Sequence, residues 1–167
     1  PYRIFLEGNH EHRISRVLET SPELTGGRHG IGMGQLEIDS YYDEFVPYEG
    51  MTPGIREVDG VSYAHFFASG SMGRPIGGQH QASSLVSYNL TSSVCGHSHI
   101  ADFSIRATPH GQMIMGLVCG VYQDYRSSWA GRVNDMWWKG VVVLRNVENG
   151  VFSPSFVSLR ELREAYV

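Results

Sequence analysis

Two histidines in the middle of the chain have the spacing of metal ligands. His97 and His99 follow the apolar run Ser93-Val94-Cys95 and a glycine, with one residue between them. Neutral imidazole is a general ligand for manganese, iron, zinc and nickel. Gly96 lets the backbone turn, so the two imidazoles can diverge toward two different ions. The alternative is a pair of surface histidines in a turn.

A second group of polar residues lies near the start of the chain, the Gly-Asn-His-Glu motif at residues 8–11. The side-chain oxygen of Asn9 can ligate a divalent cation, and His10 can protonate a leaving oxygen beside it. Glu11 can orient that histidine, since a carboxylate partner fixes its tautomer and raises its basicity. Asn9 can also cap the helix that follows, and this role does not exclude metal binding.

Strands are expected directly ahead of both motifs. Residues 2–7 indicate a short strand that runs into the Gly8-Asn9 turn signal, and residues 11–18 have helical spacing of Ile14, Val17 and Leu18. Residues 93–95 form another expected strand. A strand whose end opens a loop and then a helix is a frequent place for chemistry in α/β folds.

The segment between the motifs is expected to supply one more histidine. Residues 55–67 have the pattern of a hairpin around Asp59-Gly60, a favoured two-residue turn, which places His65 near the end of the second strand. Residues 68–78 are expected to form a Gly/Ser-rich loop. Residues 79–90 are expected to form a helix, whose inward residues are Ala82, Leu85 and Val86.

The remaining segments complete a pattern of strands with a few helices, antiparallel in the later part. Hairpins are expected around residues 109–111 and 149–150, followed by a closing helix over 159–165. Residues 20–53 are rich in Gly, Pro, Thr and Tyr without a clear period. They are expected to form a loop excursion or lid, with a short helix from Leu36 to Phe45.

Size and composition are those of one soluble domain. The chain has 167 residues, 41% of them hydrophobic and 18% charged, with a net charge of −4. That charge gives no basic footprint for a passive nucleic-acid-binding module. No apolar run approaches the roughly 20 residues that span a bilayer. Cys95 and Cys119 are expected as buried thiols rather than a disulfide, which favours a cytoplasmic location.

Taken together, the two motifs resemble the calcineurin-like metallophosphoesterase superfamily. Its pattern runs Asp-x-His, Gly-Asp, Gly-Asn-His-Asp/Glu, a lone His, and Gly-His-x-His. Residues 8–11 match the third element, His65 the lone histidine, and residues 96–99 the last. The resemblance covers about residues 2–125 of the chain. It implies an α/β fold, a four-layer αββα sandwich of two mixed sheets with helices outside.

The resemblance also implies roles for these residues. Asn9, His65 and His97 would hold one divalent metal ion and His99 the other, with manganese favoured over iron, zinc and nickel. His10 would be the acid for the leaving group, and Glu11 would position it. A metal-bridging hydroxide would attack phosphorus in line, so the chain would act as a phosphodiesterase, nuclease or phosphomonoesterase. The substrate would be a phosphate ester, including a nucleotide or nucleic acid.

The chain departs from the family pattern at its start. Only seven residues precede Gly8, so the Asp-x-His and Gly-Asp elements are absent from this sequence. These elements supply most ligands of the first metal and the carboxylate that bridges both. We therefore expect residues 1–167 to be the C-terminal part of one metallophosphoesterase domain, incomplete on its N-terminal side. By themselves they should bind metal weakly and hydrolyse poorly, with the missing N-terminal segment as partner.

Weaker candidates accompany this set. Arg13 and Arg74 can contact a substrate phosphate, and His80 is a possible substitute for His65. Surface or turn positions are expected for the other three histidines, His12, His29 and His110. The three tryptophans, at 129, 137 and 138, are expected to close the core or an interface rather than to stack on a base.

Two other functions compete with the enzyme. The first is a non-catalytic binding scaffold that keeps the fold; such members usually lose the histidine of the Asn-His motif or several ligands, whereas this chain keeps them. The second is a mononuclear structural metal site. Structural zinc takes four closely set Cys/His ligands, and Cys95 and Cys119 lack paired spacing.

Overall fold

The computed structural model describes residues 1–25 and 30–166. The protein is a mixed α/β structure with several sheets, as expected. The chain divides into two compact units, Pro1–Ile55 and Arg56–Val167, and we describe each by itself. His29, expected at the surface or in a turn, lies outside the described residues.

In the first unit, the expected strand and helix both form. Strand β1 (Ile4–Leu6) is followed by helix α1 (Asn9–Thr20), longer at both ends than the sequence predicts. Strand β1 pairs in parallel with β2 (Glu44–Val46). The backbone N–H of Arg3 also donates to the Asp43 carboxylate, at 2.7 Å, just ahead of β2.

The segment 20–53 is more structured than an irregular excursion. Its described residues form η1 (Pro22–Thr25), η2 (Met33–Leu36), α2 (Ile38–Tyr41), β2, β3 (Tyr48–Glu49) and β4 (Thr52–Pro53). The helix expected from Leu36 to Phe45 is wrong at its C-terminal end. Phe45 instead belongs to β2, where it pairs with Phe5 of β1, and the two rings pack 5.9 Å apart. This pairing satisfies backbone hydrogen-bonding groups of both strands. A lid role for this segment stays a prediction.

The second unit is built on a five-stranded sheet in the order β10-β11-β9-β6-β5. These strands are β5 (Arg56–Val58), β6 (Val61–Ala64), β9 (Ser92–Cys95), β10 (Ala101–Ala107) and β11 (Met113–Cys119). The hairpins β5-β6 and β10-β11 confirm the expected turns. The central strand β9 runs parallel to both of its neighbours, β6 and β11.

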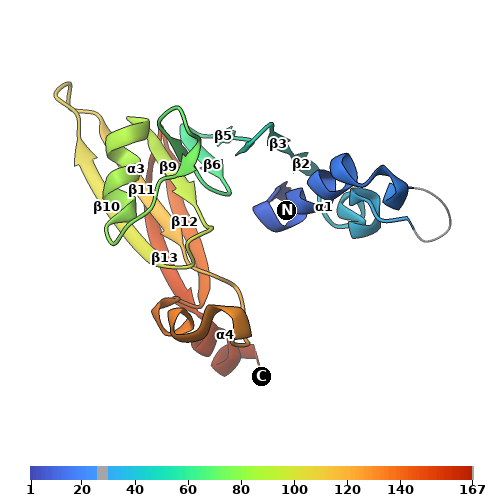
Figure 1. Ribbon diagram of the computed structural model, residues 1–167. Helices are drawn as coiled ribbons and strands as arrows, with labels where there is room; N and C mark the ends of the chain where they lie inside the picture. Colours follow the sequence, from blue (N-terminus) through green and yellow to red (C-terminus); the bar gives the residue numbers. More distant parts are fainter. Residues whose placement is uncertain (26–29, 167) are drawn as a thin grey trace. The chain divides into compact units, whose positions relative to one another are not determined.

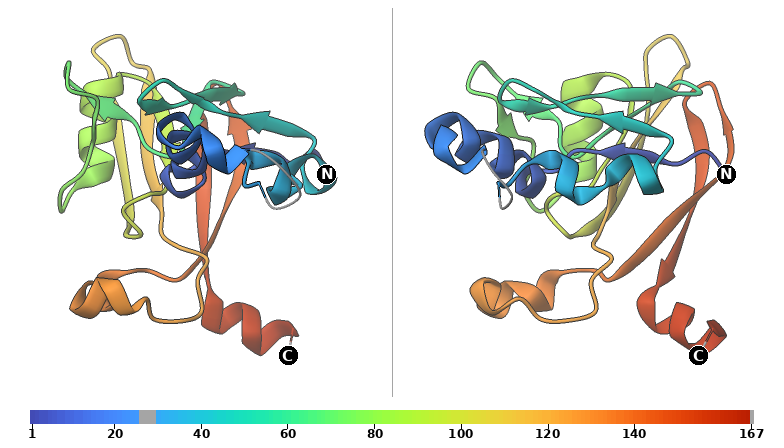
Figure 2. Two further views of the ribbon diagram at one scale, coloured as in Figure 1. Left: turned by 45° about the vertical axis from the view of Figure 1, so that its right-hand side comes forward. Right: turned by 90° about the vertical axis from the view of Figure 1, so that its right-hand side faces the viewer.

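Helix α3 (Gln81–Asn89) covers one face of this sheet. Ala82, Leu85 and Val86 are fully buried, as the helical spacing predicts. Gly116 of β11 allows the close approach, because a Cβ at that position would lie 2.3 Å from the carbonyl oxygen of Ala82. The long hairpin of β12 (Gly140–Glu148) and β13 (Val151–Ser158) covers the opposite face (Figure 2). This unit therefore has a helix, a sheet and a second, two-stranded sheet in successive layers.

Strand alternation assigns the two cysteines to opposite faces of the sheet. Cys95 belongs to the cluster under α3, whereas Cys119 packs against the cluster that contains Phe152. Both thiols are free, which confirms the expectation, although Cys119 is only half-buried. Burial raises the pKa of Cys95 to about 12 and that of Cys119 to about 11.

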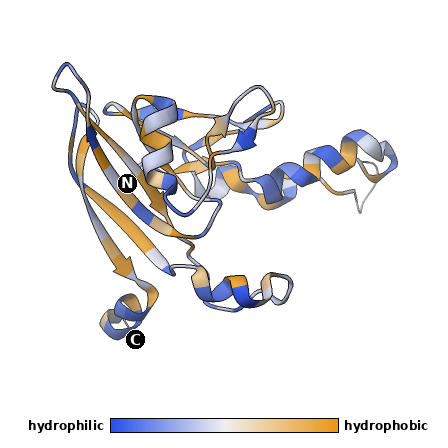
Figure 3. Ribbon diagram, turned by 60° about the vertical axis from the view of Figure 1, so that its left-hand side comes forward, coloured by the Kyte–Doolittle hydropathy of each residue, from blue (hydrophilic) through white to orange (hydrophobic). Residues whose placement is uncertain are grey.

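Shorter elements complete the second unit. The expected loop 68–78 contains a small hairpin of β7 (Ala68–Ser69) and β8 (Arg74–Pro75), followed by the predicted helix. The 3-10 segment η3 (Ser128–Met136) precedes β12, and α4 (Leu159–Tyr166) closes the chain as expected. In Figure 3 the strands carry much of the apolar colouring, while α4 is largely hydrophilic.

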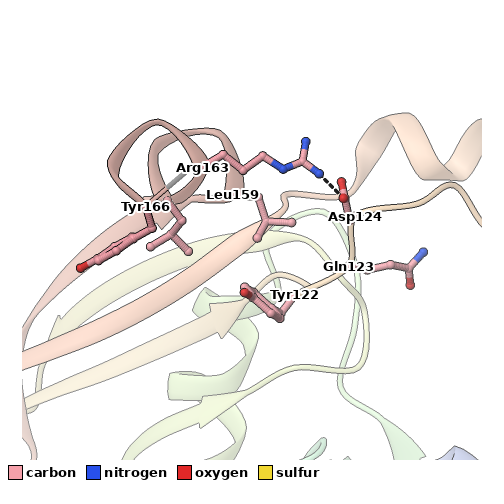
Figure 4. A pocket seen from close by; sticks show the side chains of 7 residues that line it. Tyr122, Gln123, Asp124, Leu159, Arg163 and Tyr166 are labelled. Carbon is pink, nitrogen blue, oxygen red and sulfur yellow. Dashed lines mark ion pairs between the residues drawn. The ribbon is translucent and has the colours of Figure 1, made fainter.

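Helix α4 is tied to the segment after β11 by an ion pair between Arg163 and Asp124. The two residues line a pocket together with Tyr122, Gln123, Leu159, Leu162 and Tyr166 (Figure 4). None of these residues was predicted to carry chemistry. In the described part of the chain, no helix is both long and apolar enough to cross a membrane.

Candidate metal site

His65 and His97 are brought together by the ends of two adjacent parallel strands. Strands β6 and β9 run side by side with Ala64 opposite Cys95, so both end at the same edge of the sheet. The ladder continues for one residue, because the N–H of Gly96 donates to the carbonyl of His65 at 3.2 Å. Side chains that follow neighbouring parallel strands therefore meet at this edge.

The geometry of the two imidazoles fits a shared ion. The Nε2 atom of His65 lies 3.1 Å from the Nδ1 atom of His97, and both side chains are half-buried. If each nitrogen bound one ion at about 2.0–2.1 Å, this separation would correspond to a ligand–metal–ligand angle of roughly 100°. That is an ordinary angle between adjacent ligands. The same separation also suits a hydrogen bond between the rings.

The Gly-His-Ser-His loop has an unusual backbone. His97 and His99 both have φ of 63°, in the left-handed region that residues other than glycine seldom adopt. Such a conformation costs about 1–3 kcal/mol per residue and must be held by its surroundings. The N–H of Ser98, between them, donates to the carbonyl of Gly96 at 2.8 Å. The two histidine rings contact different groups. The left-handed residues are the histidines themselves rather than Gly96, on which the sequence-based expectation of a turn relied.

Gln81, the first residue of α3, holds this loop in place by hydrogen bonding. Its amide oxygen accepts a hydrogen bond from the hydroxyl of Ser98 at 2.5 Å, and its amide nitrogen donates to the carbonyl of Ile76 at 2.9 Å. The side chain is only 1% exposed, and its bond to Ile76 is buried. Sequence reasoning missed this residue, because nothing in a glutamine at the start of a helix indicates its partner.

Asp102 supports the same helix from β10. Its Oδ2 accepts the backbone N–H of Ala82 at 2.8 Å, in the first turn of α3. One of the unsatisfied donors at the helix N-terminus is thereby paired, by a residue 20 positions away in the chain. Asp102 lies outside every motif of the sequence, and only the packing of β10 beside α3 reveals its role.

His99 has a different environment from His97. Its ring meets the ring of Trp137 edge-on, with centroids 4.4 Å apart, and its carbonyl accepts the N–H of Trp138 at 3.0 Å. Within residues 1–25 and 30–166, no cluster of three or more His, Cys, Asp and Glu side chains is placed to hold a metal ion. His65 and His97 thus form a pair of candidate ligands, and His99 is one by itself.

The Gly-Asn-His-Glu motif starts α1 in the first unit. The N-cap residue is Gly8, so Asn9 is already in the first turn and the capping role considered for it is wrong. Instead, the side chain of Glu11 stabilises the N-terminus of the helix, because its Oε2 accepts a hydrogen bond from the backbone N–H of Gly8 at 3.0 Å. His10 is exposed. The orientation of His10 by Glu11 stays a prediction.

A buried carboxylate lies directly ahead of this motif. Glu7 is 4% exposed; its Oε2 accepts the N–H of Tyr48 at 2.5 Å, and its Oε1 lies 3.6 Å from Nδ1 of His12. The ring of His12 stacks on that of Tyr48 at 4.1 Å, so the surface position expected for His12 is wrong. Burial and the neighbouring Glu7 and Glu11 carboxylates raise the pKa of the Tyr48 phenol to about 12.

The remaining candidates are exposed. Arg13 lies on α1, Arg74 on β8, and His80 at the N-cap of α3. His65, rather than His80, is therefore the histidine placed beside His97. His110 is in an exposed turn, as expected.

The tryptophans only partly follow the sequence prediction. Trp138 packs against Phe156 of the hairpin, and Trp137 is half-buried. A core position is wrong for Trp129, which is 73% exposed. Its segment η3 leaves the strands β11 and β12 that it connects (Figure 2).

Comparisons of this chain with protein-family models, with curated proteins and with solved structures found no match.

Proposed function

We propose that this chain belongs to a metal-dependent phosphoester hydrolase of the calcineurin-like type, a phosphodiesterase, nuclease or phosphomonoesterase. The observation that carries the proposal is the His65–His97 pair, with ring nitrogens 3.1 Å apart at the ends of two parallel strands. The left-handed backbone at His97 and His99 supports it, since such conformations cluster at functional sites.

In this proposal Asn9, His65 and His97 hold one divalent ion and His99 belongs to the other, with manganese favoured over iron, zinc and nickel. When bound, the ions supply an activated water and offset negative charge on phosphorus. Imidazole and amide oxygen are suitable donors for all four metals. The missing ligands would come from the Asp-x-His and Gly-Asp elements of the family pattern.

The residues of this chain have separate tasks in the reaction. Gln81 and Ser98 keep the histidine loop in its left-handed conformation, so His97 and His99 are in place before substrate arrives. His10, exposed on the first turn of α1, gives a proton to the leaving oxygen. Arg13 and Arg74 are the candidate contacts to the phosphate oxygens.

The proposal extends to the fold, a four-layer αββα sandwich. It is supported by the layers of Arg56–Val167, where α3, the five-stranded sheet and the β12-β13 hairpin follow one another. This is the order of three of the four layers.

The test is hydrolysis of bis(p-nitrophenyl) phosphate by the full-length protein with added Mn²⁺. Turnover should require the ion, and His10→Ala should lower kcat by about 10²–10⁴-fold without loss of metal, since it removes only the proton donor. His110→Ala, in an exposed turn, is the matched control. Absence of Mn²⁺-dependent turnover would favour the binding scaffold instead. Full activity in His10→Ala would show that His10 is not the proton donor.

A further inference from the structure

Two tryptophans extend outward from the candidate ligand His99. The ring of Trp137 meets His99 at 4.4 Å, and the ring of Trp129 lies 5.8 Å from that of Trp137, tilted by 52°. The backbone links the same segments, because the N–H of Trp138 donates to the carbonyl of His99. An aromatic surface therefore begins at the proposed metal site and continues away from it.

The outer end of this surface faces solvent. Trp129 is 73% exposed, and Met136 at the other end of η3 is 71% exposed. Indole is a large, flat and mostly apolar side chain, so an exposed indole offers a surface on which a flat ligand can stack. Figure 2 shows η3 as the orange helical segment that leaves the strands.

The segment that carries Trp129 is nevertheless well fixed. Asn134 is 4% exposed and bonds three backbone groups: its Oδ1 accepts the N–H of Ser127, and its Nδ2 donates to the carbonyls of Ser127 and Gly131. An ion pair between Arg126 and Asp135 spans the same loop. A rigid loop that presents an open aromatic ring loses little entropy when a flat ligand stacks on it.

We propose that Trp129 and Trp137 bind the base of a nucleotide whose phosphate lies at the metal site, so that the substrates are nucleoside phosphate esters. This inference rests on the proposed function, which assigns the phosphate to the ions near His99. A nucleotide has an anionic end and a flat aromatic end joined by a sugar. It therefore needs a polar site next to an aromatic surface. His99, Trp137 and Trp129 follow one another in space in that order.

The test compares two probes that differ only by the base, adenosine 5′-monophosphate and ribose 5-phosphate. Binding to the full-length protein is measured by calorimetry with and without Mn²⁺. Stacking on an aromatic side chain is worth about 1–3 kcal/mol per base, so the nucleotide should bind about tenfold more tightly. Trp129→Ala should remove the difference and Trp129→Phe should restore most of it. Tyr88→Ala is the control, since Tyr88 is comparably exposed, at 67%, on α3.

Several outcomes would overturn the inference. Equal binding of the two probes, no nucleotide binding, or an unchanged affinity in Trp129→Ala would each do so. So would a dimer in light scattering that dissociates in Trp129→Ala, because a second copy would then cover the tryptophans. Failure of the phosphoesterase itself is distinguishable: Mn²⁺ and His97→Ala would leave both affinities unchanged, while the preference for the base would persist.

Discussion

The Nε2 atom of His65 and the Nδ1 atom of His97 lie 3.1 Å apart, although the two residues are separated by 32 positions in the chain. Their meeting follows from the parallel pairing of β6 and β9, which ends both strands at one edge. The ring of Phe66 packs 5.1 Å from that of His97. Two ring nitrogens that are far apart in the sequence thus lie within hydrogen-bonding distance of each other.

The first prediction concerns metal affinity. His65→Ala and His97→Ala should each weaken Mn²⁺ or Zn²⁺ binding by at least about tenfold, because each removes one of two adjacent donors. Calorimetric titration measures the affinity. His80→Ala, at the exposed N-cap of α3, should bind like the wild type. Equal affinities in all three variants would rule out the histidine pair as a metal site.

The second prediction concerns the buried glutamine behind the loop. Gln81→Leu should lower the free energy of unfolding by about 1–3 kcal/mol, since it leaves the carbonyl of Ile76 unpaired. It should also weaken metal binding, because the hydroxyl of Ser98, between the two histidines, loses its short hydrogen bond to Gln81. Urea unfolding and metal titration measure the two effects. Gln79→Leu, at an exposed position, is the control. Wild-type metal affinity in Gln81→Leu would show that the histidine loop keeps its conformation without Gln81.

The third prediction concerns the cap of α3. Asp102→Ala should cost about 0.5–2 kcal/mol of stability, because the N–H of Ala82 loses its acceptor. Asp102→Asn should keep most of that stability, since the amide oxygen of asparagine accepts the same bond. Chemical denaturation of both variants decides the matter. Equal losses in the two would mean that charge, rather than the hydrogen bond, is what α3 requires.

The fourth prediction concerns Cys119. Its pKa of about 11 keeps the thiol protonated near pH 8, so alkylation by iodoacetamide should be much slower in the folded than in the unfolded protein. Because the folded protein retains this proton when the unfolded chain has lost it, Cys119 favours unfolding as pH rises above about 9. Stability of Cys119→Ala should therefore fall less steeply between pH 9 and 11 than that of the wild type. Identical pH profiles would contradict the raised pKa.

Much of the local structure could be predicted from the chain. The alternation in residues 55–67 and the Asp59-Gly60 turn gave β5 and β6, and the spacing of Ala82, Leu85 and Val86 gave the buried face of α3. The main error was at Phe45, expected in a helix. A three-residue strand such as β2 has no period of its own, and its conformation depends on pairing with β1.

For the candidate site, the sequence by itself determined which side chains could ligate a metal and that each follows a strand: His65 after β6, and His97 and His99 after Gly96. Local spacing carries that information, because turn residues and strand alternation act over a few positions. Only the tertiary structure decided that His65 faces His97, that Gln81 holds Ser98, and that Asp102 caps α3. Those contacts depend on which strands pair and in which register, and register is a property of the packed sheet rather than of any one segment.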